Sequence, residues 1–104
     1  MRGDDGALAA VAFDDGSELA LDALLVHASL HQRSQLVAQL GVELTSTPLS
    51  EELVAVAPTF KTSVPGVFAA GDVCNPMQSV ALAVSSGSVA AAAIVRELTV
   101  ELSV

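Results

Sequence analysis

The segment TSVPGVFAAGDV, which runs from Thr62 to Val73, decides how this chain is expected to fold. Its Val-Pro-Gly turn leads into a short apolar run, Val67 to Ala70, that is typical of a strand covered on both faces. The run ends at Gly71 and Asp72, and a long helix is expected soon after them. The sequence therefore predicts a carboxylate at the carboxyl end of a buried strand, beside a helix N-terminus. Open α/β sheets bind their ligands at such an edge.

The expected helix has a recognisable start. Asn75 is a good N-cap, Pro76 suits the first helical position, and Gln78 stands three residues after the cap, as in a capping box. We expect the helix to run from Pro76 to about Leu98. Small residues recur on one of its faces at Ala83, Gly87 and Ala91. This spacing predicts a close crossing against another backbone.

The N-terminal part of the chain is typical of a strand hairpin. Ala7 to Phe13 is apolar, the turn Asp14 to Ser17 contains Gly16, and Glu18 to Leu21 alternates as a return strand would. A second apolar run, Ala23 to Ala28, predicts a buried strand.

The middle of the chain predicts one short helix and one short strand. The helix is expected to begin near Ser29 or His31 and to end at Leu40, because Gly41 stands where a helix stops. Residues 42–44 are expected to be extended, residues 45–48 to form a loop, and residues 53–57 to form a strand. Together these elements predict an α/β fold with an N-terminal strand hairpin, a short helix, a central strand and a long C-terminal helix.

Composition excludes several classes of function. The net charge of −8 argues against nucleic acid or an anionic membrane surface as a partner. Cys74 is the only cysteine, so no disulfide, zinc cluster or Cys-x-x-Cys pair can form within the chain.

The acidic start does not resemble a secretory signal, which favours a cytoplasmic location. The apolar run from Val80 to Val95 is slightly short for a membrane span, so a buried helix of a soluble protein is favoured.

The whole run from Thr62 into the long helix resembles the flavin-binding segment of the thioredoxin reductase-like, FAD-dependent pyridine nucleotide-disulfide oxidoreductases. The finer pattern, Gly-Asp-x-x-x-Pro-Met before a helix with a late glycine, resembles the gliotoxin oxidase-like fungal reductases and their actinobacterial relatives. The hairpin and the Leu-Leu-Val-His run resemble the end of the nicotinamide-binding domain of that family. The resemblance implies a partial FAD/NAD(P)-binding, Rossmann-like fold. It assigns residues 1–58 to the end of the NAD(P)-binding domain and residues 59–104 to the C-terminal segment of the FAD-binding domain.

The resemblance also implies a set of cofactor-binding residues. Asp72 would accept hydrogen bonds from the ribityl chain of FAD, and Gly71 would let the flavin approach the backbone. Gln78, Ser79 and Val80 would stand at the helix start that faces the pyrimidine edge of the flavin ring. No catalytic residue and no metal ligand is assigned.

Each of these residues has a simpler interpretation as well. Asp72 can be a polar strand-end residue, and Gln78 can merely close the capping box. For Cys74 a structural role is favoured over a redox role. His27 and His31 are four residues apart, but no third ligand is evident, so metal binding is not favoured.

The expected activity is limited by missing motifs. None of the seven glycines forms Gly-x-Gly-x-x-Gly, so the fingerprints for FAD and for NADPH are both absent from the sequence, as is the redox cysteine pair. We expect a fragment of a flavoprotein, inactive alone, that needs the missing part or a partner chain and tends to form homo-oligomers. The alternative is a non-catalytic binding or assembly module that keeps the scaffold.

Overall fold

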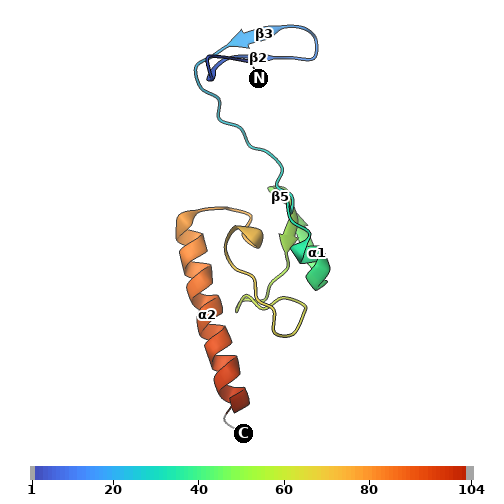
Figure 1. Ribbon diagram of the computed structural model, residues 1–104, viewed down its shortest axis with the longest axis vertical. Helices are drawn as coiled ribbons and strands as arrows, with labels where there is room; N and C mark the ends of the chain where they lie inside the picture. Colours follow the sequence, from blue (N-terminus) through green and yellow to red (C-terminus); the bar gives the residue numbers. More distant parts are fainter. Residues whose placement is uncertain (1, 103–104) are drawn as a thin grey trace.

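Within residues 2–102, which a computed structural model describes, the chain forms two small antiparallel sheets, two α-helices and one 3-10 helix. The molecule is elongated, with extents of 68 × 25 × 24 Å. The first sheet lies at one end, and an extended segment joins it to the remaining elements, which gather beside the long C-terminal helix (Figure 1). The predicted mixture of strands and helices in an α/β fold is confirmed.

The first sheet is a meander. Its strands are β1 (Arg2–Asp4), β2 (Ala7–Ala12) and β3 (Glu18–Ala20), in the spatial order β1-β2-β3. The strands that were predicted on either side of the Asp-Gly turn are confirmed, each slightly shorter than expected. Most of the described side chains in this sheet are exposed.

The turn between β2 and β3 follows its sequence signal. Gly16 adopts a φ of 88°, which glycine reaches without steric cost. The Oδ1 atom of Asp15 accepts hydrogen bonds from the backbone N and the Oγ of Ser17. These bonds, the side-chain one first, lower the pKa of the Asp15 carboxyl.

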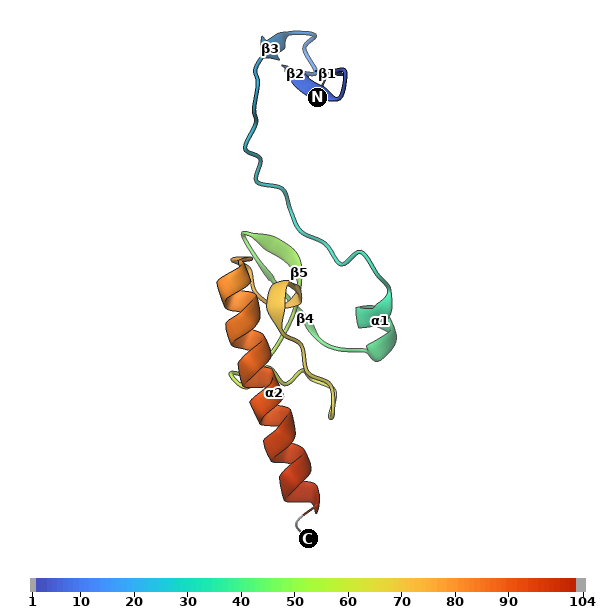
Figure 2. The same cartoon turned by 60° about the vertical axis from the view of Figure 1, so that its left-hand side comes forward.

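The run Ala23 to Ala28 does not form the predicted strand. It crosses as extended chain from the first sheet to the rest of the molecule (Figure 2). Leu25 is 101% exposed and Val26 is 60% exposed. A strand needs a neighbour for its backbone hydrogen bonds, and none of the described segments pairs with this run.

The middle of the chain holds α1 (Leu36–Leu40), β4 (Leu44–Thr47) and β5 (Ser50–Val54). The helix begins later than predicted but ends as expected, with Gly41 in the left-handed conformation at φ 71°. The strands β4 and β5 pair as a hairpin. The predicted loop at 45–48 was therefore mostly wrong, and the strand predicted at 53–57 lies three residues earlier.

The buried core is small and centres on β5. Leu53 and Val54 are 3% and 2% exposed, and Cys74 and Ala90 are the other buried apolar residues in the described part of the chain. The backbone N of Glu43 donates to the Oγ of Ser63 at 2.7 Å. Segments on both sides of residue 58 thus contact one another, and the predicted division between 58 and 59 stays a prediction.

The segment Val67 to Ala70 does not form the predicted strand but is half-buried extended chain. It folds back on the preceding turn, with one isolated bridge between Lys61 and Phe68 and with the N of Ala69 donating to the O of Phe60 at 3.0 Å. The sequence pattern of a central strand is present. Within the described residues, however, no strand of several residues lies beside this segment to extend the pairing beyond that single bridge.

The long helix is α2 (Val80–Leu102). It begins four residues later than predicted, because Ser79 and not Asn75 caps it: the O of Ser79 accepts from the N of Ala83, and its Oγ accepts from the N of Leu82. The close backbone crossing predicted at Gly87 is absent from the described residues, since no atom from outside its own helix lies within 4 Å of where its Cβ would stand.

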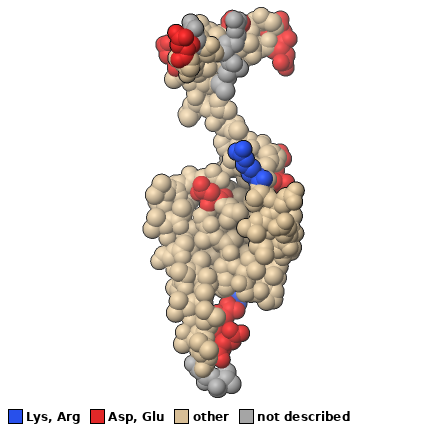
Figure 3. Space-filling view, viewed as in Figure 1, with Lys and Arg blue, Asp and Glu red and all other residues tan. Residues whose placement is uncertain are grey.

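Most of α2 is exposed. By length and composition alone it is apolar enough to cross a membrane, as many core helices of soluble proteins also are. Acidic side chains gather on the first sheet and along the C-terminal half of α2 on the face that Figure 3 shows.

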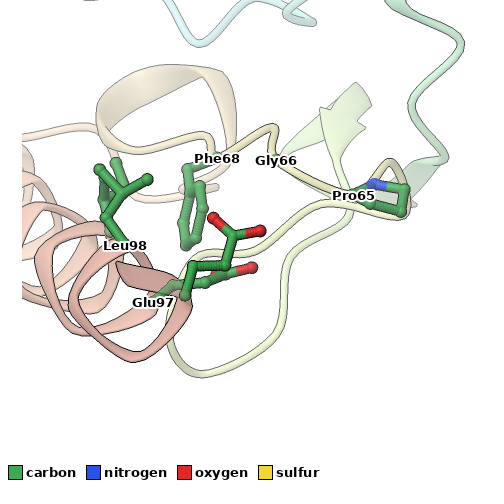
Figure 4. A pocket seen from close by; sticks show the side chains of 7 residues that line it. Pro65, Gly66, Phe68, Glu97 and Leu98 are labelled. Carbon is green, nitrogen blue, oxygen red and sulfur yellow. The ribbon is translucent and has the colours of Figure 1, made fainter. Parts of the chain in front are cut away.

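An ion pair joins the C-terminal half of α2 to the segment around Lys61. The Nζ of Lys61 lies 3.0 Å from the Oε2 of Glu97 and 5.9 Å from the centre of the Phe68 ring. Beside this pair is a hollow of about 460 Å³ in which Phe68 lies next to Leu98, with Pro65 on the far side (Figure 4).

Candidate functional site

The Gly-Asp dipeptide opens a 3-10 helix, η1 (Gly71–Val73), that packs against α2. Gly71 has a φ of +81°, a conformation in which a side chain is strained. Apart from its two chain neighbours, no residue has an atom within 4 Å of where a Cβ of Gly71 would stand. Glycine is therefore required here by the backbone conformation and not by crowding, and space for a bound group is open on that side.

A buried serine fixes this turn to the helix. The N of Gly71 donates to the Oγ of Ser86 at 2.9 Å, and Ser86 is 3% exposed. The Nδ2 of Asn75 donates to the O of Gly71 at 2.9 Å and to the same Oγ at 3.4 Å. Asn75, which was predicted as the helix cap, instead closes this three-residue network.

Asp72 presents its side chain to solvent while its backbone is held. The Nε2 of Gln78 donates to the O of Asp72 at 3.2 Å, so the structure brings these two predicted residues together. Both line a hollow of about 200 Å³. The other residues around it are Leu30, His31, Gln32, Ser50, Glu52, Leu53 and Val73.

Of the three residues predicted at the helix start, Val80 is the first residue of α2, Ser79 caps the helix, and Gln78 lies one residue before the cap. The first intrahelical bond joins Ala83 to Ser79, so the amides of Val80 and Ala81 precede it and have no acceptor within the helix. Val80 is 81% exposed. An exposed carboxylate can accept hydrogen bonds from hydroxyl groups, and the positive end of a helix stabilises negative charge. The arrangement is therefore chemically suited to a ligand that combines hydroxyls with an electron-rich group.

Cys74 has the surroundings of a structural cysteine. Its side chain is buried, and its Sγ donates to the O of Gly71 at 3.4 Å and to the O of Ala69 at 3.6 Å. Burial raises the pKa of the thiol, which disfavours the reactive thiolate. These observations favour the structural role over the redox role.

The two histidines do not meet. His31 lies with acidic residues of β5, its ring nitrogens 3.7 Å from Glu51 and 3.9 Å from Glu52. His27 lies in the extended segment. Among residues 2–102, no group of three potential ligands is arranged to hold a metal ion.

The sequence did not point to Ser86, nor to the segment 30–32 beside the Asp72 hollow. Gln32 donates from its N to the Oε2 of Glu52 at 2.6 Å and from its Nε2 to the O of Glu52 at 2.8 Å. One signal for Ser86 was available, a hydroxyl on an otherwise small and apolar helix. Nothing in the sequence distinguished it from its neighbours Ser85 and Ser88.

Known proteins resemble this chain over most of its length. The pyridine nucleotide-disulphide oxidoreductase family matches residues 1–87. The thioredoxin reductase tcpT of Claviceps purpurea is 41% identical over 90 residues, which are 86% of this chain and 27% of that protein. The thioredoxin reductase sirT of Leptosphaeria maculans is 38% identical over 79 residues, which are 76% of this chain and 23% of that protein. The chain thus spans about a quarter of the length of these curated relatives.

A solved structure agrees with this relationship. The oxidoreductase from Agrobacterium tumefaciens superposes with a TM-score of 0.72 at 33% identity, over 86% of this chain and 30% of that protein. The family match covers well over half of the chain, and the fold agrees. The chain therefore belongs to the pyridine nucleotide-disulphide oxidoreductase family, as a thioredoxin reductase-like segment.

Proposed function

We propose that this chain supplies the C-terminal, flavin-side part of an FAD-dependent NAD(P)H:disulfide oxidoreductase. The observation that carries the proposal is the exposed carboxylate of Asp72, which follows a glycine at positive φ and lies on a turn packed against α2. The proposal includes a division of the chain into two parts. Residues 1–58 would form the end of the NAD(P)-binding domain, and residues 59–104 would form the end of the FAD-binding domain.

The residues fit the ribityl and ring end of FAD. Asp72 would accept hydrogen bonds from the ribityl hydroxyls, and Gly71 leaves room for the cofactor near the backbone. Val80, at the N-terminus of α2, would offer a backbone N–H to the electron-rich edge of the ring, while Gln78 and Ser79 hold the turn and the helix start. When bound, FAD supplies the group that accepts hydride and passes electrons on to a disulfide.

The remaining parts of such an enzyme have to come from elsewhere. The sequence contains no Gly-x-Gly-x-x-Gly to hold the pyrophosphate of FAD or of NAD(P)H, and Cys74 has no partner cysteine. Hydride transfer requires the nicotinamide and the flavin in a fixed arrangement. We therefore propose that this chain is inactive alone and acts together with a segment carrying both fingerprints and the cysteine pair, in the cytoplasm.

A chimera tests this proposal by supplying the missing fingerprints and cysteine pair. In it, this whole chain replaces the matching 90 residues of the Claviceps purpurea reductase. We expect the chimera to purify with bound FAD and to oxidise NADPH in the presence of a disulfide. The chain alone should neither bind FAD in a fluorescence titration nor oxidise NADPH. A correctly folded chimera that retains no flavin absorbance after incubation with FAD and removal of the free cofactor would overturn the proposal and favour the non-catalytic assembly module.

Association is a second expected property. Apolar side chains are exposed along α2, among them Val84 at 67% and Val95 at 63%. Apolar surface of this extent favours contacts between molecules. We therefore expect the chain to form homo-oligomers when no complementing segment is present, and multi-angle light scattering should report a mass above that of one chain. A monodisperse monomer that melts cooperatively would contradict this expectation.

A further inference from the structure

The polar network around Ser86 is saturated. A serine hydroxyl has one hydrogen to donate and can accept two hydrogen bonds. Here the Oγ of Ser86 donates to the O of Leu82 at 2.7 Å, with the O of Ala83 at 3.3 Å as a second acceptor. It accepts from the N of Gly71 and from the Nδ2 of Asn75. At 3% exposure, water cannot readily replace any of these partners.

The network holds Gly71, the residue before Asp72, at both of its backbone polar atoms. The N of Gly71 is bound by Ser86, and the O of Gly71 accepts from the N and the Nδ2 of Asn75 at 3.1 and 2.9 Å. On the C-terminal side, the O of Asp72 accepts from Gln78. The backbone of Asp72 is thus fixed on both sides, while its carboxylate is left exposed.

We propose that Ser86 is a positioning residue for the flavin site: together with Asn75 it fixes the Gly71–Asp72 turn to the second turn of α2. The inference rests on the proposed function, because it assigns Asp72 as the ligand of the ribityl chain. The hydroxyl of Ser86 sets where the Asp72 carboxylate stands relative to the N-terminus of α2. Both groups then meet the cofactor without reorganisation, which is how a supporting residue raises affinity.

The first experiment measures the network itself in the full chain. Ser86→Ala leaves the N of Gly71 without its acceptor, so exchange of the Gly71 amide, followed by NMR, should become roughly 2- to 12-fold faster. Ser86→Thr keeps the hydroxyl and should restore slow exchange. Ser88→Ala, the same substitution on the exposed side of α2, is the matched control and should change nothing. Unchanged Gly71 exchange in Ser86→Ala overturns the inference.

The second experiment links the network to FAD in the chimera, which contains the whole chain. Ser86→Ala should weaken FAD binding roughly 2- to 12-fold, and Ser86→Thr should restore it. In an Asp72→Ala background, Ser86→Ala should have no further effect, because the two residues act in series. A purely structural role would weaken binding by the same factor in both backgrounds, which overturns the inference.

The outcomes separate the two claims. A wild-type chimera that binds no FAD overturns the proposed function, and the flavin role of Ser86 falls with it. A wild-type chimera that binds FAD with an affinity that Ser86→Ala leaves unchanged overturns the inference alone.

Discussion

FAD affinity of the chimera should fall by about 10- to 150-fold when Asp72 is replaced by alanine, the range expected for losing a hydrogen bond to a charged group. The exposed carboxylate lies on a turn whose backbone is held at Gly71 and at the O of Asp72, so its removal takes away a preformed acceptor. The measurement is a titration of the apoprotein with FAD, followed by flavin fluorescence.

Two variants sharpen this experiment. Asp72→Asn keeps one acceptor oxygen and should weaken binding less than Asp72→Ala. Asp22→Ala removes an equally charged, exposed side chain from the extended segment and should leave the affinity unchanged. If Asp72→Ala binds FAD as tightly as the wild type, the carboxylate does not contact the ribityl chain and the site has been placed wrongly.

Asp72 was predicted at the end of a buried strand, beside a helix N-terminus. The structure places it instead in the 3-10 helix η1, because Val67–Ala70 has no partner strand within the described residues, while Gly71 before it adopts a positive φ. The supporting residue was not predictable. Ser86 lies fifteen residues after Gly71, and its role depends on how α2 packs against η1. The residues next to Ser86 in the sequence do not indicate that packing.

The predictions about the fold also separate into those that depend on local conformation and those that depend on distant partners. The turn at Gly16 and the helix end at Gly41 were predicted correctly, because both depend on glycine adopting a positive φ. The runs Ala23–Ala28 and Val67–Ala70 were predicted as strands because they are apolar. Apolar composition shows that a segment can be buried, but strand formation also needs a partner backbone. Among residues 2–102, neither run has more than an isolated bridge.

The two apolar runs therefore differ from β5 in burial, and substituting one leucine in β5 and one in the extended segment tests this difference. Leu53 on β5 is 3% exposed, whereas Leu25 in the extended segment is 101% exposed. Truncating a buried leucine removes its transfer free energy and leaves a cavity, which together cost about 2–5 kcal/mol. We expect Leu53→Ala to lower the free energy of unfolding of the full chain by about that amount, measured by urea denaturation with circular dichroism.

Leu25→Ala is the matched control, because it deletes the same atoms from a side chain that already lies in water. An exposed substitution of this kind changes stability by no more than about 0.5 kcal/mol, so the Leu25→Ala midpoint should stay with the wild type while the Leu53→Ala midpoint falls. Since the described core holds only four buried apolar residues, the loss at Leu53 has few neighbours to compensate it. Equal losses in both variants would mean that the segment from 23 to 28 is buried in solution, against an additional strand or a second molecule.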